Sequence, residues 1–160
     1  MENKTVTLDR SAMFKMLHDI PDGEEFLLRV TGWSMLPLLF HDRSLVYLKK
    51  VSHYTPRKGD VVLFWRMDGS IVLHRVRKVG KDGVLTINGD AQSWTEHIFP
   101  TQVMATVTHY VRFKRDVSVD SAGYRLYRSL WCPLRWIHPL GAKVVYFWHR
   151  IPQKLFGRGK

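Results

Sequence analysis

The sequence has one cysteine, Cys132, and no long apolar run. A single cysteine excludes an internal disulfide and a multi-cysteine zinc site. No spacing among the eight histidines places two metal ligands on one face, so we expect no metal.

The longest uncharged run, residues 97–111, has 15 residues and includes polar ones, whereas a bilayer span needs about 20 mostly apolar residues. The first ten residues carry four charges and no apolar run follows them. We therefore expect neither a signal peptide nor a transmembrane helix, and a protein that is cytoplasmic or peripherally membrane-associated.

The net charge of +11 is unevenly distributed along the 160 residues. Residues 1–111 carry 14 Lys and Arg against 12 Asp and Glu, whereas residues 112–160 carry 11 against 2. The same C-terminal segment holds 9 of the 20 aromatic residues. The composition predicts one domain with an extension: a helical lead over 1–25, a β domain over 26–113 and a basic aromatic helical tail over 114–160. The tail either packs on the body or binds an anionic membrane surface. No specific nucleic acid is expected, because no recognised nucleic-acid motif accompanies the charge.

Periodicity predicts a mainly β fold between two helical ends. Met13, Phe14, Met16 and Leu17 give a short N-terminal helix an apolar side. Runs rich in aliphatic and aromatic residues, separated by turn residues, predict strands in a small mixed or antiparallel β domain at 26–31, 44–51, 60–66, 71–79, 84–88 and 103–113. Two further helices are expected, one after Asp120-Ser121 and one from Pro139 to Pro152.

Three residues of this pattern have the chemistry that acyl transfer needs. Ser34 follows a strand that ends at Gly32, where its hydroxyl and its own backbone N–H can be exposed together as nucleophile and oxyanion donor. His74 lies in the middle of a strand among aliphatic residues, and Asp90 in the turn after the next strand could orient its ring. Each also has an ordinary explanation: a turn serine, a core histidine and a turn aspartate that bonds its own backbone.

Taken in order, four segments resemble the type I signal peptidase family, which shares a fold with the LexA-type self-cleaving repressors. The family patterns are G-x-S-M-x-P, G-D-x-V-x-F, (K or H)-R-(V or I) and a G-D-N turn. The corresponding segments here are Gly32-Trp33-Ser34-Met35-Leu36-Pro37, Gly59-Asp60-Val61-Val62-Leu63-Phe64, His74-Arg75-Val76 and Asn88-Gly89-Asp90-Ala91. The resemblance covers residues 26–113, a little over half of the chain.

The resemblance implies a role for each matching residue. Ser34 would be the nucleophile, and His74 would be the base in place of the lysine of most bacterial members, as in the archaeal and endoplasmic-reticulum branch. Asp90 matches the aspartate of the turn, Glu96 is the candidate for a further acidic residue, and Met35 would line the substrate cleft. No cofactor is implied.

The sequence therefore predicts a serine endopeptidase that removes a leader or signal-like segment from a peptide or protein substrate by a Ser-His-Asp mechanism. One alternative is a non-catalytic module on the same fold that binds a peptide, a membrane or nucleic acid. Another is a LexA-like repressor that works with a separate DNA-binding subunit.

Overall fold

The computed structural model describes residues 10–131 and 133. This part of the chain folds into one eight-stranded sheet with a helix before it and a helix after it. In chain order the elements are α1 (Arg10–Asp19), β1 (Glu25–Arg29), β2 (Leu45–Lys50), β3 (Val61–Trp65), β4 (Ile71–Val79), β5 (Leu85–Asn88), β6 (Glu96–Ile98), the 3-10 turn η1 (Pro100–Gln102), β7 (Val103–Arg112), β8 (Arg115–Ser118) and α2 (Ala122–Trp131).

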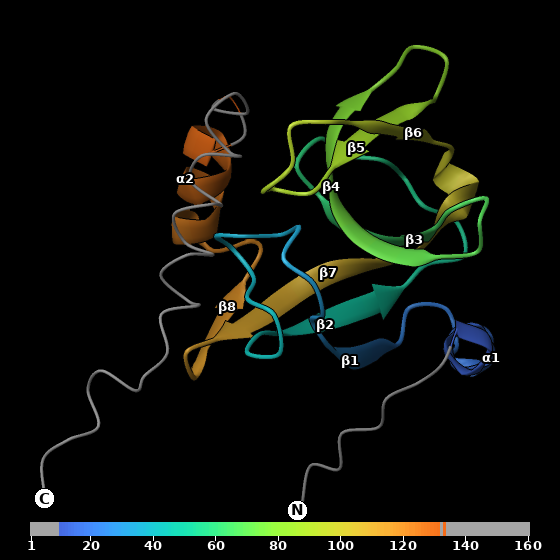
Figure 1. Cartoon of the computed structure of the whole chain (residues 1–160), viewed down its shortest axis with the longest axis horizontal. Coiled ribbons are helices and arrows are strands. Elements are labelled where there is room, and N and C mark those ends of the chain that lie inside the picture. The colour runs from blue at the N-terminus through green and yellow to red at the C-terminus, as the bar shows by residue number, and fades with distance from the viewer. Residues whose placement is uncertain (1–9, 132, 134–160) are drawn as a thin grey trace, which may run out of the picture.

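The strand order is β1-β2-β7-β3-β4-β5-β6, with β8 paired to β7, and every described pairing is antiparallel. Figure 1 shows β1, β2, β7 and β8 on one side of the molecule and β4, β5 and β6 on the other. Strand β3 joins these halves because it pairs with both β7 and β4. The two helices lie at opposite ends, α1 beside β1 and α2 beyond β8 (Figure 1).

The curled sheet encloses two apolar clusters, and β3 contributes to both. Val61 and Leu63 belong to the larger cluster, whereas Val62 and Phe64 belong to the smaller one. Successive strand residues point to opposite faces, so both faces of β3 are covered. This explains why its sequence is a continuous apolar run and not an alternating one.

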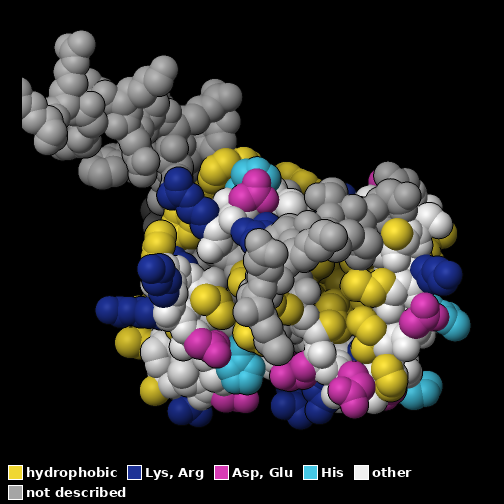
Figure 2. Space-filling model, turned by 90° about the horizontal axis from the view of Figure 1, so that it is seen from below, with side chains coloured by type: hydrophobic (Ala, Val, Ile, Leu, Met, Phe, Trp, Pro, Cys, Tyr) yellow, Lys and Arg dark blue, Asp and Glu magenta, His cyan; other side chains and the backbone are white. Residues whose placement is uncertain are grey.

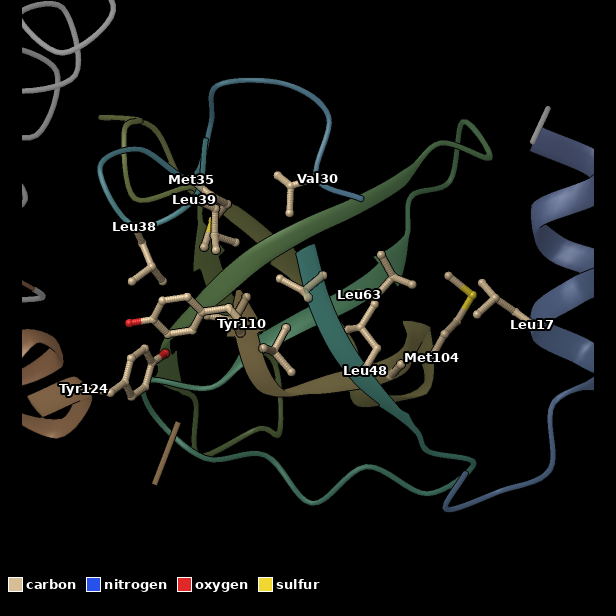
Figure 3. Packing of buried hydrophobic residues seen from close by; sticks show 14 residues of the cluster. Leu17, Val30, Met35, Leu38, Leu39, Leu48, Leu63, Met104, Tyr110 and Tyr124 are labelled. Atoms are coloured by element: carbon tan, nitrogen blue, oxygen red, sulfur yellow. The ribbon is translucent and has the colours of Figure 1, made fainter. Parts of the chain in front are cut away.

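The larger cluster is closed at its two ends by the two helices (Figure 3). Leu17 of α1 enters beside Met104, and Tyr124 of α2 enters beside Tyr110 with ring centroids 5.9 Å apart. Leu17 is buried, and burying a leucine side chain stabilises a fold by roughly 1.5–3 kcal/mol. Both helices are therefore part of the body of the protein.

The predicted fold class, mainly antiparallel β with a short N-terminal helix and a C-terminal helix, is confirmed. Two short strands, β6 and β8, are additional to those predicted. Strand β8 carries the sheet on to Ser118, past the predicted domain end at residue 113. The helix expected from Pro139 to Pro152 lies outside the described residues.

The described surface has mixed charge on the face shown in Figure 2. Lys and Arg side chains lie there among Asp and Glu side chains, in keeping with the near balance of charges in residues 1–111. Within residues 10–131, neither helix has the length and the apolar character that crossing a bilayer requires.

Candidate active site

Ser34 lies in the loop that leads from β1 to β2, two residues after Gly32. Gly32 has a φ of +89°, a left-handed conformation that side chains with a Cβ rarely adopt. A Cβ added to Gly32 would meet no atom within 4 Å, so the backbone angle and not space favours glycine here. The Gly32 N–H donates to His41 Nδ1 at 2.9 Å, which fixes the turn immediately before the serine.

The turn after β5 holds the Ser34 backbone in place. Ala91 N–H donates to the Ser34 carbonyl oxygen at 2.8 Å. A Cβ built on Gly89 would come within 2.5 Å of that oxygen and 2.9 Å of Ser34 Cβ, so glycine allows the two segments to approach closely. Among the described residues, the Ser34 N–H donates to no acceptor. This N–H is therefore available to an oxyanion.

His74 lies in β4, and its ring is 1 % exposed. Its Nδ1 atom is 3.1 Å from Glu96 Oε1 of β6. A carboxylate accepts hydrogen bonds, so in the neutral ring Nδ1 carries the proton and Nε2 keeps its lone pair. Burial lowers the pKa of His74 to about 4, although the charge of Glu96 acts in the opposite direction. The imidazole is therefore neutral at neutral pH, the state a general base needs.

Glu96 is also held by an arginine that directly follows β3. Arg66, which follows β3, donates from Nη2 to Glu96 Oε1 at 2.7 Å and from Nε to Oε2, forming a bidentate pair. The Arg66 guanidinium also lies 5.9 Å from the ring centroid of Trp94, and Trp94 meets the His74 ring edge-on at 6.3 Å. Nothing in the sequence marked Arg66 for this position, because it is one arginine among many at the end of a strand.

Asp90 was predicted to orient the His74 ring, but in the structure it contacts two arginines. Its carboxylate is fully buried and accepts from Arg75 Nε at 2.8 Å, from Arg75 Nη2 at 2.6 Å and from Arg77 Nη2 at 2.9 Å. The hydrogen-bond partner of His74 Nδ1 is Glu96. The strand alternation explains the difference, since Arg75 and Arg77 point to the face of β4 opposite His74.

The buried arginine also anchors α2. Arg75 Nη1 donates to the Tyr124 hydroxyl at 2.8 Å and to the Gly59 carbonyl oxygen at 2.9 Å. Its guanidinium lies 5.7 Å from the Tyr124 ring centroid and 6.0 Å from that of Tyr127. The pKa of Tyr124 is raised by burial, so its hydroxyl stays protonated. A buried charge of this kind needs paired and hydrogen-bonded neighbours, which Asp90 and α2 supply.

The structure brings the predicted residues together only in part. The turn after β5, which contains Asp90, contacts the Ser34 loop through the hydrogen bond from Ala91 N–H to the Ser34 carbonyl oxygen. Arg75, next to His74, pairs with Asn88 at the start of this turn. No hydrogen bond joins Ser34 Oγ to His74 among the described residues. In unliganded enzymes such contacts are often long and tighten only when substrate binds.

Met35 was predicted to line the substrate cleft, but its side chain is 2 % exposed and belongs to the larger apolar cluster. This position does not support a contact with substrate. The exposed aromatic residues near the site are Trp33, which precedes the serine, and Trp94, which is 50 % exposed. Within the described part of the chain, no group of three or more His, Cys, Asp or Glu is arranged to hold a metal ion.

Comparison with known proteins identifies the family of this chain. A family model described as Peptidase S24-like matches residues 3–108, well over half of the sequence. Comparisons with curated proteins and with solved structures gave no significant match. The matched segment runs from before α1 into β7 and includes Ser34, His74, Asp90 and Glu96. The chain therefore belongs to the peptidase S24-like family, within the LexA and signal peptidase superfamily.

Proposed function

We propose that this protein is a serine endopeptidase in which Ser34 is the nucleophile, His74 the general base and Glu96 the carboxylate that orients the base. The observation that carries the proposal is the neutral, buried His74 with Nδ1 bonded to Glu96. Asp90 supports the Ser34 turn through its bonds to Arg75 and Arg77 and takes no direct part in proton transfer.

In this mechanism, residues of the chain carry out each proton transfer and stabilise the oxyanion. As Ser34 Oγ attacks the scissile carbonyl carbon, its proton passes to His74 Nε2, and the Ser34 N–H donates to the oxyanion that forms. Glu96 stabilises the imidazolium by accepting from Nδ1. The imidazolium returns the proton to the leaving amine as the C–N bond breaks. Water then attacks the acyl-enzyme ester, with His74 again as the base.

Peptidase family membership implies a peptide or protein substrate. We propose that this substrate carries a leader or signal-like segment that binds in extended form, with main-chain hydrogen bonds for affinity and side-chain pockets for specificity. Strand β1 ends the sheet order, so one of its edges pairs with no other described strand. The exposed rings of Trp33 and Trp94 are available to apolar side chains of such a segment.

The direct test is incubation of the full-length protein with peptides encoded near its gene, followed by mass spectrometry. Wild type should produce a defined cleavage, and Ser34→Ala should abolish it without loss of the fold. His74→Ala should cost nearly as much, because residues of such a triad act as a unit. The matched control is Ser93→Ala, which removes an exposed hydroxyl from the loop before β6 and should leave cleavage unchanged.

A non-catalytic binding module on the same fold is the alternative, and the absent Ser34–His74 hydrogen bond is the observation that favours it. If wild type and Ser34→Ala both bind the peptides equally well and neither cleaves any of them, the peptidase proposal is wrong and the binding module is supported.

We further propose that the C-terminal region attaches the enzyme peripherally to an anionic membrane surface. Residues 112–160 hold 11 Lys and Arg, 2 Asp and Glu and 9 aromatic residues. At the start of this region, α2 presents Leu126 and Leu130, each 61 % exposed and one helical turn apart. Basic and apolar groups together favour the headgroup region of anionic bilayers. Co-sedimentation with phosphatidylglycerol vesicles that weakens with salt is expected, whereas indifference to vesicles contradicts attachment.

A further inference from the structure

A cavity of about 600 Å³ lies where α2 meets β4 and the loop before β3. Its described lining consists of Lys58, Gly59, Val76, Arg77, Arg128, Ser129 and Pro133. Three of these residues are cationic, and none of them is Asp or Glu. The Arg128 side chain crosses Gly59 so closely that a Cβ there would come within 2.4 Å of Arg128 Cδ. Cations from β4, from the loop before β3 and from α2 therefore converge on one cavity.

Arg77 has a buried donor that no described residue satisfies. Its side chain is 10 % exposed; Nε donates to Asn88 Oδ1, and Nη2 donates to Asp90 Oδ1 at 2.9 Å. The remaining nitrogen, Nη1, is buried and has no hydrogen-bond partner in the part of the chain that the structure describes. Leaving a buried donor unpaired costs roughly 1–3 kcal/mol, and more for a charged group. An acceptor in the cavity would remove this cost.

The local charge balance indicates that this acceptor is an anion. Arg75 and Arg77 share one carboxylate, that of Asp90, so this buried cluster of three side chains carries an excess positive charge. Lys58 and Arg128 add to it from the cavity wall. Lys58 and Arg128 also line an adjoining smaller cavity together with Asp60 and Asp120, and Asp60 accepts a hydrogen bond there from the Tyr54 hydroxyl. The larger cavity therefore combines excess positive charge with an unused guanidinium donor.

We propose that this cavity binds a phosphate group, with Arg77 and Arg128 as guanidinium donors and Lys58 as a flexible cation at the rim. The planar guanidinium matches phosphate oxygens geometrically, and lysine adds charge without directional constraint. The volume lies within the usual range of small-ligand sites, so a phosphate group that carries an organic substituent also fits. The phosphate site uses none of Ser34, His74 and Glu96, and the proposal holds whether or not the chain is a peptidase.

The test is isothermal titration of the full-length protein with inorganic phosphate, at constant ionic strength maintained with chloride. Wild type should bind phosphate saturably, and Arg128→Gln should weaken binding at least tenfold. Arg77→Gln should do the same, but it also removes a contact to Asp90, so its fold is checked by circular dichroism. Lys78→Gln is the matched control, because this exposed residue follows Arg77 on β4 and does not line the cavity.

A wild-type response that chloride alone reproduces would overturn the proposal. Equal phosphate affinity in wild type and Arg128→Gln would also overturn it, because the basic C-terminal segment would then account for the binding. Binding of phosphatidylglycerol and phosphatidylcholine vesicles identifies the source of the group. If Arg128→Gln also loses preference for the anionic vesicles, the phosphate belongs to a lipid headgroup. If it loses only inorganic phosphate, the ligand is a soluble phosphate compound.

Discussion

Replacing Glu96 by glutamine tests which carboxylate supports His74, the proposed catalytic base. The change keeps the size of the side chain and an oxygen acceptor but removes the charge that faces the imidazolium formed during attack. With 3.1 Å between His74 Nδ1 and Glu96 Oε1 and an effective dielectric constant of about 20, two full charges interact by about 5 kcal/mol. Arg66 neutralises part of the carboxylate, so we take about half of this energy, close to 3 kcal/mol. A tenfold change in rate corresponds to about 1.4 kcal/mol, so kcat should fall about 100-fold.

The assay measures kcat and KM for Glu96→Gln on the peptide that wild type cleaves. KM should change little, because Glu96 acts on the base and not on the bound peptide. Glu24→Gln, at an exposed carboxylate before β1, is the control and should retain wild-type rates. A Glu96→Gln enzyme whose kcat stays within threefold of wild type would refute the role of Glu96.

Three further predictions follow from the same geometry. Asp90→Asn should destabilise the protein by about 3–5 kcal/mol, because it leaves Arg75 and Arg77 without their carboxylate partner. Thermal unfolding should show a fall in Tm on the order of 10 °C, and an unchanged Tm would contradict this. Burial lowers the pKa of His74 to about 4, and the proposed base must be neutral, so kcat/KM should rise with pH through about 4 and level off above it. A rise centred at 6.5, the ordinary value, would show that the imidazole is not desolvated. Gly89→Ala should displace Ser34, slow cleavage and lower the free energy of unfolding by roughly 1–3 kcal/mol. Gly123→Ala, where a Cβ meets no atom within 4 Å, should change neither cleavage nor stability. Equal behaviour of the two alanine variants in cleavage and unfolding assays would contradict the close packing at Gly89.

The long apolar strands could be predicted because their signal is local. Ile71–Val79 has the alternation and β-branched residues of a strand, and the structure forms β4 over the same residues. The two missed strands have no such signal: β6 has three residues and begins Glu-His, and β8 reads Arg-Asp-Val-Ser. These strands form because neighbouring strands offer a free edge, which is a property of the assembled sheet.

The candidate site shows the same division between local and tertiary information. The sequence predicts that Ser34 lies in a turn and His74 in a strand, and both residues do. It does not decide whether Asp90 or Glu96 meets the imidazole, because that depends on the face of β4 that each carboxylate reaches. The burial of Arg75 could not be foreseen either, since alternation alone assigns it to the polar face, whereas in the structure the turn after β5 and α2 cover it.

The docking of α2 has a consequence for shortened forms of the protein. This helix lies beyond the segment matched by the family model, yet Tyr124 bonds Arg75, Arg75 bonds Asp90, and the residue after Asp90 bonds the Ser34 carbonyl. A chain that stopped at Ser118 would keep every strand that the structure describes but would expose the Arg75–Asp90 pair, which is now buried. The minimal unit that positions Ser34, the proposed nucleophile, therefore extends through α2, beyond the residues that the family model matches.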